Sequence, residues 1–225
     1  NRDRDITYSN STRGIERNRD EQVDSERIMQ VWEKFFEKSK DRFLTKNQIF
    51  GLYSELSFLN DYWLKHNFSL ENWVGPRDAT NDFVDETKGK VVEVKHSSKN
   101  NIVKISSIHQ LNTSRGMILA VFELSEDDSG ENLDELVEKI INENSIDEFV
   151  FEDLLLSAGY MREKNNFNKR LKVKNEMFYT IDERFPIMEK DSIKGIVSAN
   201  YSVDLSFAKN NEIDKINVER YLDNR

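Results

Sequence analysis

The amino-acid sequence predicts an α/β fold in which helices flank a central mixed β-sheet. Stretches with apolar residues at helical spacing alternate along the chain with short runs rich in β-branched residues. Of the 225 residues, 37% are hydrophobic and 11% aromatic, which suffices for one good core and a small appendage. We therefore expect one domain over residues 24–225, with additional helices and strands at its C-terminal end. The polar segment at 1–23 is interpreted as flexible or as the tail of a missing element.

Two amphipathic helices come first. An apolar stripe predicts a helix from Asp24, and the capping box Thr45-Lys46-Asn47-Gln48 predicts another over residues 45–65. Glu55 borders the buried stripe of the second helix. Gly51 lies in the interior of this helix, where glycine costs about 1 kcal/mol relative to alanine, and the close approach of another backbone would explain it. The stripe consists of Ile49, Leu52, Leu56, Leu59 and Trp63.

A β-hairpin follows in the most informative part of the sequence. Residues 90–95 are rich in valine and predict a strand, and residues 81–84 predict a shorter one. Between them, residues 85–89 have the polar, glycine-terminated composition of a turn. A hairpin of this kind would bring Asp82 close to Glu93.

The same hairpin predicts a chemical site. Glu93 and Lys95 are two residues apart and share one face of the strand, while Val92 and Val94 point into a core. Two carboxylates, from Asp82 and Glu93, can hold a divalent cation against a phosphate oxygen, and a lysine can hold an attacking water or stabilise charge on phosphorus. We therefore predict a metal-dependent phosphodiesterase site. The alternatives are a surface ion pair for Glu93 with Lys95 and a simple turn residue for Asp82.

The remainder of the chain predicts further strands and helices. A strand at 102–105 leads into a short helix that Ser106 or Ser107 would cap and that carries Gln110. The apolar run at 117–124 predicts a buried strand that closes the sheet. The C-terminal part predicts helices at 133–141 and 146–155, the second ending at Gly159, a β-hairpin or paired strands at 170–181, a strand at 196–205 and a helix at 213–222.

Composition excludes several classes of site. No cysteine is present, which removes disulfides, thiolate nucleophiles and cysteine-based zinc sites. No Walker motif, phosphate-binding glycine loop or nucleophile elbow occurs. His66, His96 and His109 lack metal-ligand spacing, so we expect structural or solvent roles, with His96 the one to test because it follows Lys95.

The sequence contains no apolar run long enough to cross a bilayer and no signal-peptide pattern. We therefore expect a cytoplasmic protein without membrane association. Because the first residue is Asn, we expect the chain to be a fragment or a trimmed form.

Six short segments, taken in order, carry a family resemblance. They are Gly51–Leu59, Trp73–Pro76, Asp82–Phe83, Val92–Lys95, Ile105–Leu111 and Tyr201–Leu205. Together they resemble a bacterial family of PD-(D/E)XK nucleases, over a range from about Gln48 to Leu205. The resemblance implies a restriction-endonuclease-like core. One departure is Asn81, which stands where the superfamily name has Pro.

The resemblance implies a role for each candidate site residue. Asp82 and Glu93 would be the metal-binding acids, Lys95 the catalytic lysine, Glu55 the helix-borne acid and Gln110 an accessory polar residue. The implied cofactor is Mg²⁺ or Mn²⁺, with Glu55 holding a water or a second metal. An ordinary helix-surface role for Glu55 and a capping role for Gln110 stay open. The metal ligands would be Asp82, Glu93, Glu55 and the backbone carbonyl of Val94.

The activity that the resemblance implies is that of a type II restriction-like endonuclease, which hydrolyses phosphodiester bonds of double-stranded DNA. Such enzymes belong to restriction-modification or phage-defence systems, so a DNA methyltransferase is an expected partner, and cleavage of both strands favours a homodimer. One alternative is a catalytically inactive nuclease-like module that binds DNA or a protein. RNA as the substrate also stays open.

The net charge of −9 opposes phosphate binding, but the charges are unevenly distributed. Residues 88–115 contain six basic residues against Glu93 alone, and residues 162–174 form a second basic cluster with a single acid. Residues 126–153 are strongly acidic and contain a single basic residue, Lys139. We expect them to form a merely solvated surface or to coat a face turned away from nucleic acid. DNA contacts are predicted, with a solvated surface as the alternative, for Lys88, Lys99, Lys104, Arg170 and Lys172.

Overall fold

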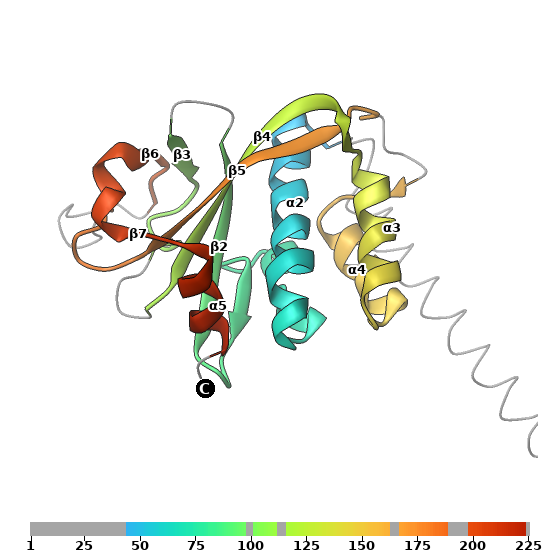
Figure 1. The fold of residues 1–225 in the computed structure, drawn as a ribbon, viewed down its shortest axis with the longest axis horizontal. Helices are drawn as coiled ribbons and strands as arrows, with labels where there is room; N and C mark the ends of the chain where they lie inside the picture. Colours follow the sequence, from blue (N-terminus) through green and yellow to red (C-terminus); the bar gives the residue numbers. More distant parts are fainter. Residues whose placement is uncertain (1–43, 98–100, 112–115, 163–166, 189–197, 224–225) are drawn as a thin grey trace, which may run out of the picture. The chain divides into compact units, whose positions relative to one another are not determined.

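A mixed β-sheet of five strands runs through the centre of the fold (Figure 1). In spatial order the strands are β1 (Phe83–Asp85), β2 (Lys90–Ser97), β4 (Ile118–Glu131), β5 (Leu171–Thr180) and β7 (Glu212–Ile213). β2 and β4 are parallel, and the other neighbouring pairs are antiparallel. The predicted α/β fold with a mixed sheet is therefore confirmed.

The computed structural model describes residues 44–97, 101–111, 116–162, 167–188 and 198–223. The segment 1–23, the helix predicted from Asp24 and the predicted DNA contact Lys99 lie outside the described residues. Within the described residues, no helix is long and apolar enough to cross a membrane.

The predicted hairpin is formed by β1 and β2. Phe83 pairs with Val92 in antiparallel register, which places Asp82, the residue before β1, opposite Glu93. The turn is closed by the side chain of Asp85, which accepts a hydrogen bond from the Lys88 amide at 2.9 Å. This register brings the two predicted metal-binding acids to the same end of the hairpin.

The predicted helix at 45–65 is confirmed as one continuous helical segment. It starts at a capping box in which Thr45 and Gln48 each bond the backbone of the other. All five residues of the predicted stripe are buried. The segment changes helix type along its length and ends at Asn67, whose φ is +58°. It consists of α2 (Lys46–Phe58), a π-helical turn (Leu59–Trp63) and a 3₁₀ turn (Leu64–His66).

The explanation predicted for Gly51 is wrong. A Cβ atom built at this position would meet nothing within 4 Å, so no backbone approaches it. Gly51 is only half-buried, at the border of the stripe, where the helix has room for a larger residue.

The two faces of the sheet are covered differently. The face that carries Val92 and Val94 packs against helices, whereas the face that carries Val91 and Leu119 packs against a two-stranded sheet and a 3₁₀ segment. The helices predicted at 133–141, 146–155 and 213–222 are confirmed, and with α2 they lie on the Val92 face. They are α3 (Leu133–Glu143), α4 (Glu148–Ser157) and α5 (Lys215–Asp223), and the other face is covered by β3 (Ile102–Ile105), β6 (Tyr201–Asp204) and η8 (Leu205–Asn211).

β3 is a strand, as predicted, but it is not the third strand of the core sheet. It pairs antiparallel with β6 in a separate sheet of two strands. Only Val103 and Ile105 of β3 are buried, so it has the single apolar face of a strand that packs on one side. The central position belongs to β4, which is buried on both faces from Ile118 to Phe122.

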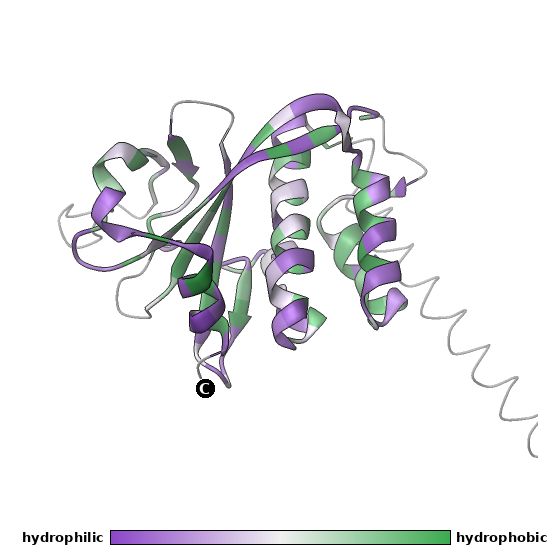
Figure 2. Cartoon of the chain, viewed as in Figure 1, coloured by the Kyte–Doolittle hydropathy of each residue, from purple (hydrophilic) through white to green (hydrophobic). Residues whose placement is uncertain are grey.

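β4 and β5 also differ from prediction. Residues 117–124 do not close the sheet, because β4 lies between β2 and β5, and residues 170–181 form one strand instead of a hairpin. No Gly or Pro interrupts residues 171–180, so nothing turns the chain there. Residues 123–131 and 170–175 extend this pair into what we call the ribbon, which Figure 2 shows as mostly hydrophilic.

The short helix predicted after β3 does not form in the described residues. Residues 106–111 make turns and bends, which we call the 106–111 loop. Ser107 does bond locally, since its hydroxyl accepts a hydrogen bond from the His109 amide at 3.2 Å. Such local bonds compete with helix formation, which explains why a serine that could cap a helix here closes a turn.

Candidate active site

Glu93 and Lys95 form a buried ion pair on β2. The carboxylate of Glu93 is 0% exposed and the Lys95 side chain 16%, and the Lys95 ammonium donates to Oε1 of Glu93. Both side chains project from the same face of the strand, as predicted, because residues two apart in a strand share a face. The alternative of a surface ion pair on an exposed strand is excluded by this burial.

Asp82 is held against β2 by its side chain and its backbone. The Val94 amide donates to Oδ2 of Asp82 at 2.7 Å. The backbone carbonyl of Asp82 accepts from the amides of Val74 and Gly75 at 2.8 and 3.0 Å. Asp82 is therefore an anchored residue next to Glu93 and Lys95, not merely part of a turn.

Glu55 reaches the same place from α2. Its Oε2 accepts a hydrogen bond from the Trp73 indole at 2.9 Å. A Cβ atom at Gly75 would lie 2.9 Å from Oδ1 of Asp82 and 3.2 Å from Oε2 of Glu55. A side chain at position 75 would therefore collide with both carboxylates. The absence of a side chain in Gly75 is what allows these two acids to lie together.

Glu55, Asp82, Glu93 and Lys95 form what we call the acid cluster, which is largely buried and holds three acids against one base. Burial, followed by repulsion from Asp82, raises the pKa of Glu93 to about 8. Burial and Asp82 also raise the pKa of Glu55, and burial raises that of Asp82 against the opposing effects of Lys95 and the Val94 amide. Glu55 and Asp82 keep part of their surface in contact with solvent, so water offsets some of this effect.

The pKa of Lys95 is also raised, which for a lysine favours the charged form. Burial by itself would lower the pKa of its ammonium, but the three acids outweigh burial and raise that pKa. Lys95 therefore stays protonated, and ionisation of all three acids leaves the cluster with excess negative charge. A cation is the natural partner for such a cluster.

The donor set fits a hard divalent cation. Within the described part of the chain, no three Asp, Glu or His side chains are grouped as a complete metal site. Mg²⁺, however, usually keeps several waters and takes only one or two carboxylates from the protein. Asp82 and Glu93 supply two carboxylates, so their chemistry suits Mg²⁺ or Mn²⁺.

Gln110 lies next to the cluster, but its side chain is used elsewhere. Its Oε1 accepts from the Ser106 amide at 2.8 Å and closes the 106–111 loop; because no helix forms there, this bond is not the helix-capping role that stayed open from the sequence. Its backbone carbonyl accepts from the Asn81 side chain at 2.7 Å. The same Asn81 amide donates to Oε2 of Glu93 at 3.0 Å, so Gln110 connects to the cluster through its backbone.

Sequence reasoning gave no role to Trp73, Gly75 or Asn81, although all three touch the acids. The first two lie in the segment Trp73–Pro76, whose tryptophan and glycine were the available signal. His96, in contrast, points away from the cluster. Its ring packs 5.7 Å from that of Phe50, on the opposite side of β2 from Lys95, and burial and Lys95 lower its pKa.

The described residues among the predicted DNA contacts lie on three different parts of the fold. Lys88 is exposed in the β1–β2 turn with its ammonium 3.8 Å from the centre of the Phe68 ring, and Lys104 is exposed on β3. Arg170 and Lys172 lie on the ribbon, at the end of β4 remote from Leu119, which pairs with Glu93.

On the ribbon these basic residues meet acidic and polar partners. Arg170 donates to Glu135 and to the carbonyl of Gly130, both at 2.8 Å, and Lys172 donates to Ser129 at 3.0 Å. Acids of the stretch 126–153 thus form ion pairs with described residues of the second basic cluster, so the two are not separate surfaces. That the acidic stretch is turned away from nucleic acid stays a prediction.

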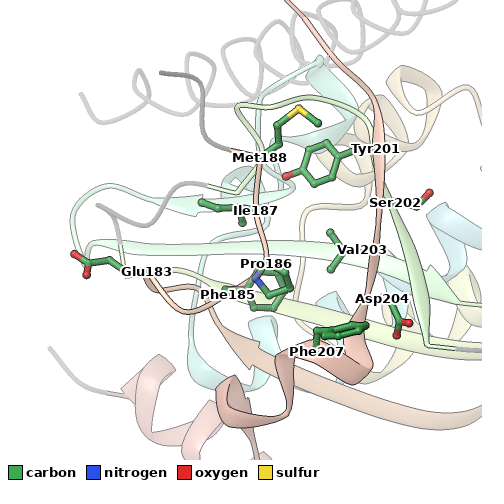
Figure 3. Close-up of a pocket in the computed structure, with 10 residues that line it drawn as sticks. All are labelled: Glu183, Phe185, Pro186, Ile187, Met188, Tyr201, Ser202, Val203, Asp204 and Phe207. Atoms are coloured by element: carbon green, nitrogen blue, oxygen red, sulfur yellow. The ribbon is translucent and has the colours of Figure 1, made fainter. Parts of the chain in front are cut away.

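A hollow of about 690 Å³ lies elsewhere, between residues 183–188 and β6 with η8 (Figure 3). Its lining is mainly apolar and includes Phe185, Met188 and Tyr201, with Phe207 80% exposed at its edge. None of the candidate site residues lines it. The chemistry of the acids and Lys95 is thus separate from this hollow.

Residues 8–206 match the sequence model of the family described as "Putative PD-(D/E)XK family member". The match covers most of the chain and confirms the resemblance seen in the sequence. No curated protein and no solved structure was found to match the chain.

Proposed function

We propose that this chain, which belongs to the PD-(D/E)XK family, is a divalent-metal-dependent nuclease that hydrolyses phosphodiester bonds in double-stranded DNA. The observation that carries the proposal is the gathering of three acids from separate segments at one strand: Glu93 is paired with Lys95, Asp82 is bonded to the Val94 amide, and Glu55 lies beside Asp82 at Gly75. A fold has little reason to bury such a cluster for stability alone, because desolvation of unbalanced charge is costly. Perturbed acids around one lysine are typical of functional sites.

Asp82 and Glu93 would hold the cation, with the Val94 carbonyl as a further ligand. When bound, Mg²⁺ or Mn²⁺ would polarise a phosphate oxygen and lower the pKa of a coordinated water. The protein contributes the placement of the two carboxylates. The Val94 amide fixes Asp82, and Lys95 fixes Glu93.

Lys95 would act on the phosphate and the attacking water. Its ammonium remains charged, because the raised pKa keeps its proton. A fixed positive charge next to the reacting phosphate stabilises the negative charge that develops there, and its remaining N–H groups can orient a water. Glu55, fixed by the Trp73 indole, would hold a further water or a second cation.

The biological setting is a finer part of the proposal, and the family resemblance alone supports it. We propose a restriction-type enzyme of a phage-defence system, acting with a DNA methyltransferase. Cleavage of both strands needs two copies of the site, so we propose a homodimer.

The test is incubation of the purified chain with plasmid, unmethylated phage DNA and RNA, each with Mg²⁺ or with a chelator. The expected result is cleavage of DNA that Mg²⁺ supports and the chelator abolishes. Asp82→Ala is the matched negative control. If Asp82→Ala retains full biological function, the inactive binding module is the better description, and cleavage of RNA alone would change the substrate class.

A further inference from the structure

Asn81 is the buried polar residue that links the acid cluster to the neighbouring loop. It is 8% exposed, and its side-chain nitrogen donates to Oε2 of Glu93 at 3.0 Å and to the carbonyl of Gln110 at 2.7 Å. A primary amide has two N–H bonds. Both are used, so the orientation of the Asn81 side chain is fixed.

The first of these bonds restrains the carboxylate of Glu93 at the oxygen that Lys95 does not contact. Lys95 donates to Oε1 and Asn81 donates to Oε2, so each oxygen of the carboxylate has a donor of its own. With Lys95 alone, the carboxylate could turn about its last bond, because torsions of this type are broad. Asn81 therefore limits the directions in which the free electron pairs of Glu93 can point.

The second bond ties the 106–111 loop to the same carboxylate. The loop is closed on itself, since the Gln110 side chain accepts from the Ser106 amide at 2.8 Å. β3, which carries the exposed Lys104, leads directly into this loop. A shift of the loop would thus pull on Asn81 and, through it, on Glu93.

We infer that Asn81 is a positioning residue that sets the orientation of Glu93 for cation binding and couples it to the 106–111 loop. This inference rests on the proposed function. A proline, the residue named for this position in PD-(D/E)XK, has no side-chain donor and could make neither bond.

The test compares Asn81→Leu with the wild-type chain in two measurements that need no catalysis. Calorimetric titration with Mn²⁺ should show a dissociation constant raised by about tenfold or more, as is typical when a residue that orients a metal ligand is lost. Hydrogen exchange in the chelator-treated protein should show the amides of Ser106 and Gln110 exchanging faster by on the order of tenfold. Asn81→Ser, which is too short to reach both acceptors, replaces Asn81→Leu if the latter does not fold.

Asn211 provides a matched control. It is 1% exposed, and its side-chain nitrogen also donates to one backbone carbonyl and one carboxylate, those of Thr180 and Asp182, both at 2.9 Å. Asn211→Leu should lower overall stability but leave Mn²⁺ affinity and the exchange of Ser106 and Gln110 unchanged.

Two outcomes would overturn the inference. One is wild-type exchange at Ser106 and Gln110 in the Asn81 variant, and the other is an equal change of Mn²⁺ affinity in both asparagine variants. A wild-type chain that binds no Mn²⁺ would count against the proposed function. In that case the exchange measurement would still decide whether Asn81 restrains the loop.

Discussion

The acid cluster and the ribbon both pair basic with acidic side chains, but in opposite surroundings. Glu93 and Lys95 are 0% and 16% exposed, whereas Arg170 of the ribbon and its partner Glu135 of α3 are each 40% exposed. The pKa of Glu93 is raised to about 8, mainly by burial. On the ribbon, the hydrogen bond from Lys174 lowers the pKa of Asp127. Next to it, in the first turn of α3, the Asn132 amide and Arg170 lower the pKa of Glu135.

This difference in burial and in the direction of the pKa shifts distinguishes a candidate site from an ordinary charged surface. Exposed pairs on the ribbon satisfy each other, remain hydrated and contribute little to stability. In the cluster, burial destabilises the charged acids, and one lysine cannot neutralise all of them. A cation would relieve that excess, so the cluster should respond to metal and pH in ways that the ribbon does not.

The largest expected effect is that of Lys95→Ala. Removal of the charge that stabilises the reacting phosphate should lower the cleavage rate by about 100-fold or more, while DNA binding is retained. Cleavage of plasmid and a gel-shift titration measure the two properties. Lys172→Ala on the ribbon is the control and should cut at the wild-type rate. Unchanged cutting by Lys95→Ala would remove this lysine from the mechanism.

Gly75→Ala should have the next largest effect. The new methyl group would lie 2.9 Å from Oδ1 of Asp82 and 3.2 Å from Oε2 of Glu55, so the acids must separate. We expect Mn²⁺ affinity to fall by about tenfold, as for other residues that position metal ligands.

Gly51→Ala is the matched glycine control, since a Cβ there meets nothing within 4 Å. It should leave Mn²⁺ affinity unchanged and stabilise α2 by about 0.5–1 kcal/mol. Denaturant unfolding and calorimetric titration of both variants check these expectations. Equal Mn²⁺ affinity in the two glycine variants would contradict the role given to Gly75.

The metal-free protein should become less stable as pH rises from about 5 to about 8. The folded-state pKa of Glu93 is about 8 against an ordinary value of 4.5, so over this window the folded state holds a proton that the unfolded state has released. Ionisation therefore favours unfolding. The raised pKa values of Glu55 and Asp82 act in the same direction.

Divalent cations bind the deprotonated acids, so their stabilising effect should increase over the same pH window. Thermal unfolding of the wild-type chain with Mn²⁺ or chelator, at several pH values, measures this. Glu135→Gln removes the exposed partner of Arg170 and leaves the acids of the cluster in place, so it should preserve the pattern. A stabilisation by Mn²⁺ that is independent of pH would contradict the electrostatics of the cluster.

Trp73→Phe should have a moderate effect on both stability and activity. It removes the indole donor to Glu55, and the loss of this bond should cost about 1 kcal/mol, because Glu55 is half-buried and water can replace part of the donor. Trp63→Phe is a matched control, because Trp63 is also 0% exposed and donates its indole N–H to the carbonyl of Ser69 at 3.2 Å. Urea unfolding should show losses in both variants, but the cleavage rate should fall only in Trp73→Phe. A similar fall in both would reduce Trp73 to a packing role.

The smallest effects concern the predicted DNA contacts. Arg170 is already paired with Glu135, so Arg170→Ala should change DNA affinity by less than about twofold. Lys104→Ala should weaken binding and reduce the slope of log affinity against log salt concentration by about one. Gel-shift titrations over a range of salt concentrations measure both. A larger loss from Arg170→Ala would place DNA on the ribbon.

Local signals in the sequence predicted the elements that carry the acids. The capping box at Thr45, the turn composition at 85–89 and the alternation around Glu93 each depend on neighbouring residues, and the structure has all three. The placement of β3 and β4 was missed, because strand order depends on which apolar faces meet across the fold. Single strands do not contain that information.

The sequence named the residues of the cluster but did not indicate their contacts. Burial of Glu93, the contact of Gly75 with two carboxylates and the bonds of Asn81 all arise between segments distant in sequence. The ion pairs between the acidic and basic segments were not visible in the sequence for the same reason. Residues 126–135 and 169–174 are separate in the sequence, but the antiparallel pairing of β4 with β5 brings them together.

The most direct measurement is an anomalous difference map from crystals of the chain grown with Mn²⁺. The predicted result is a peak in contact with the carboxylates of Asp82 and Glu93. A map with no peak there, or with Mn²⁺ bound only at Glu126 and Asp127 of the ribbon, would contradict a cation site in the buried cluster.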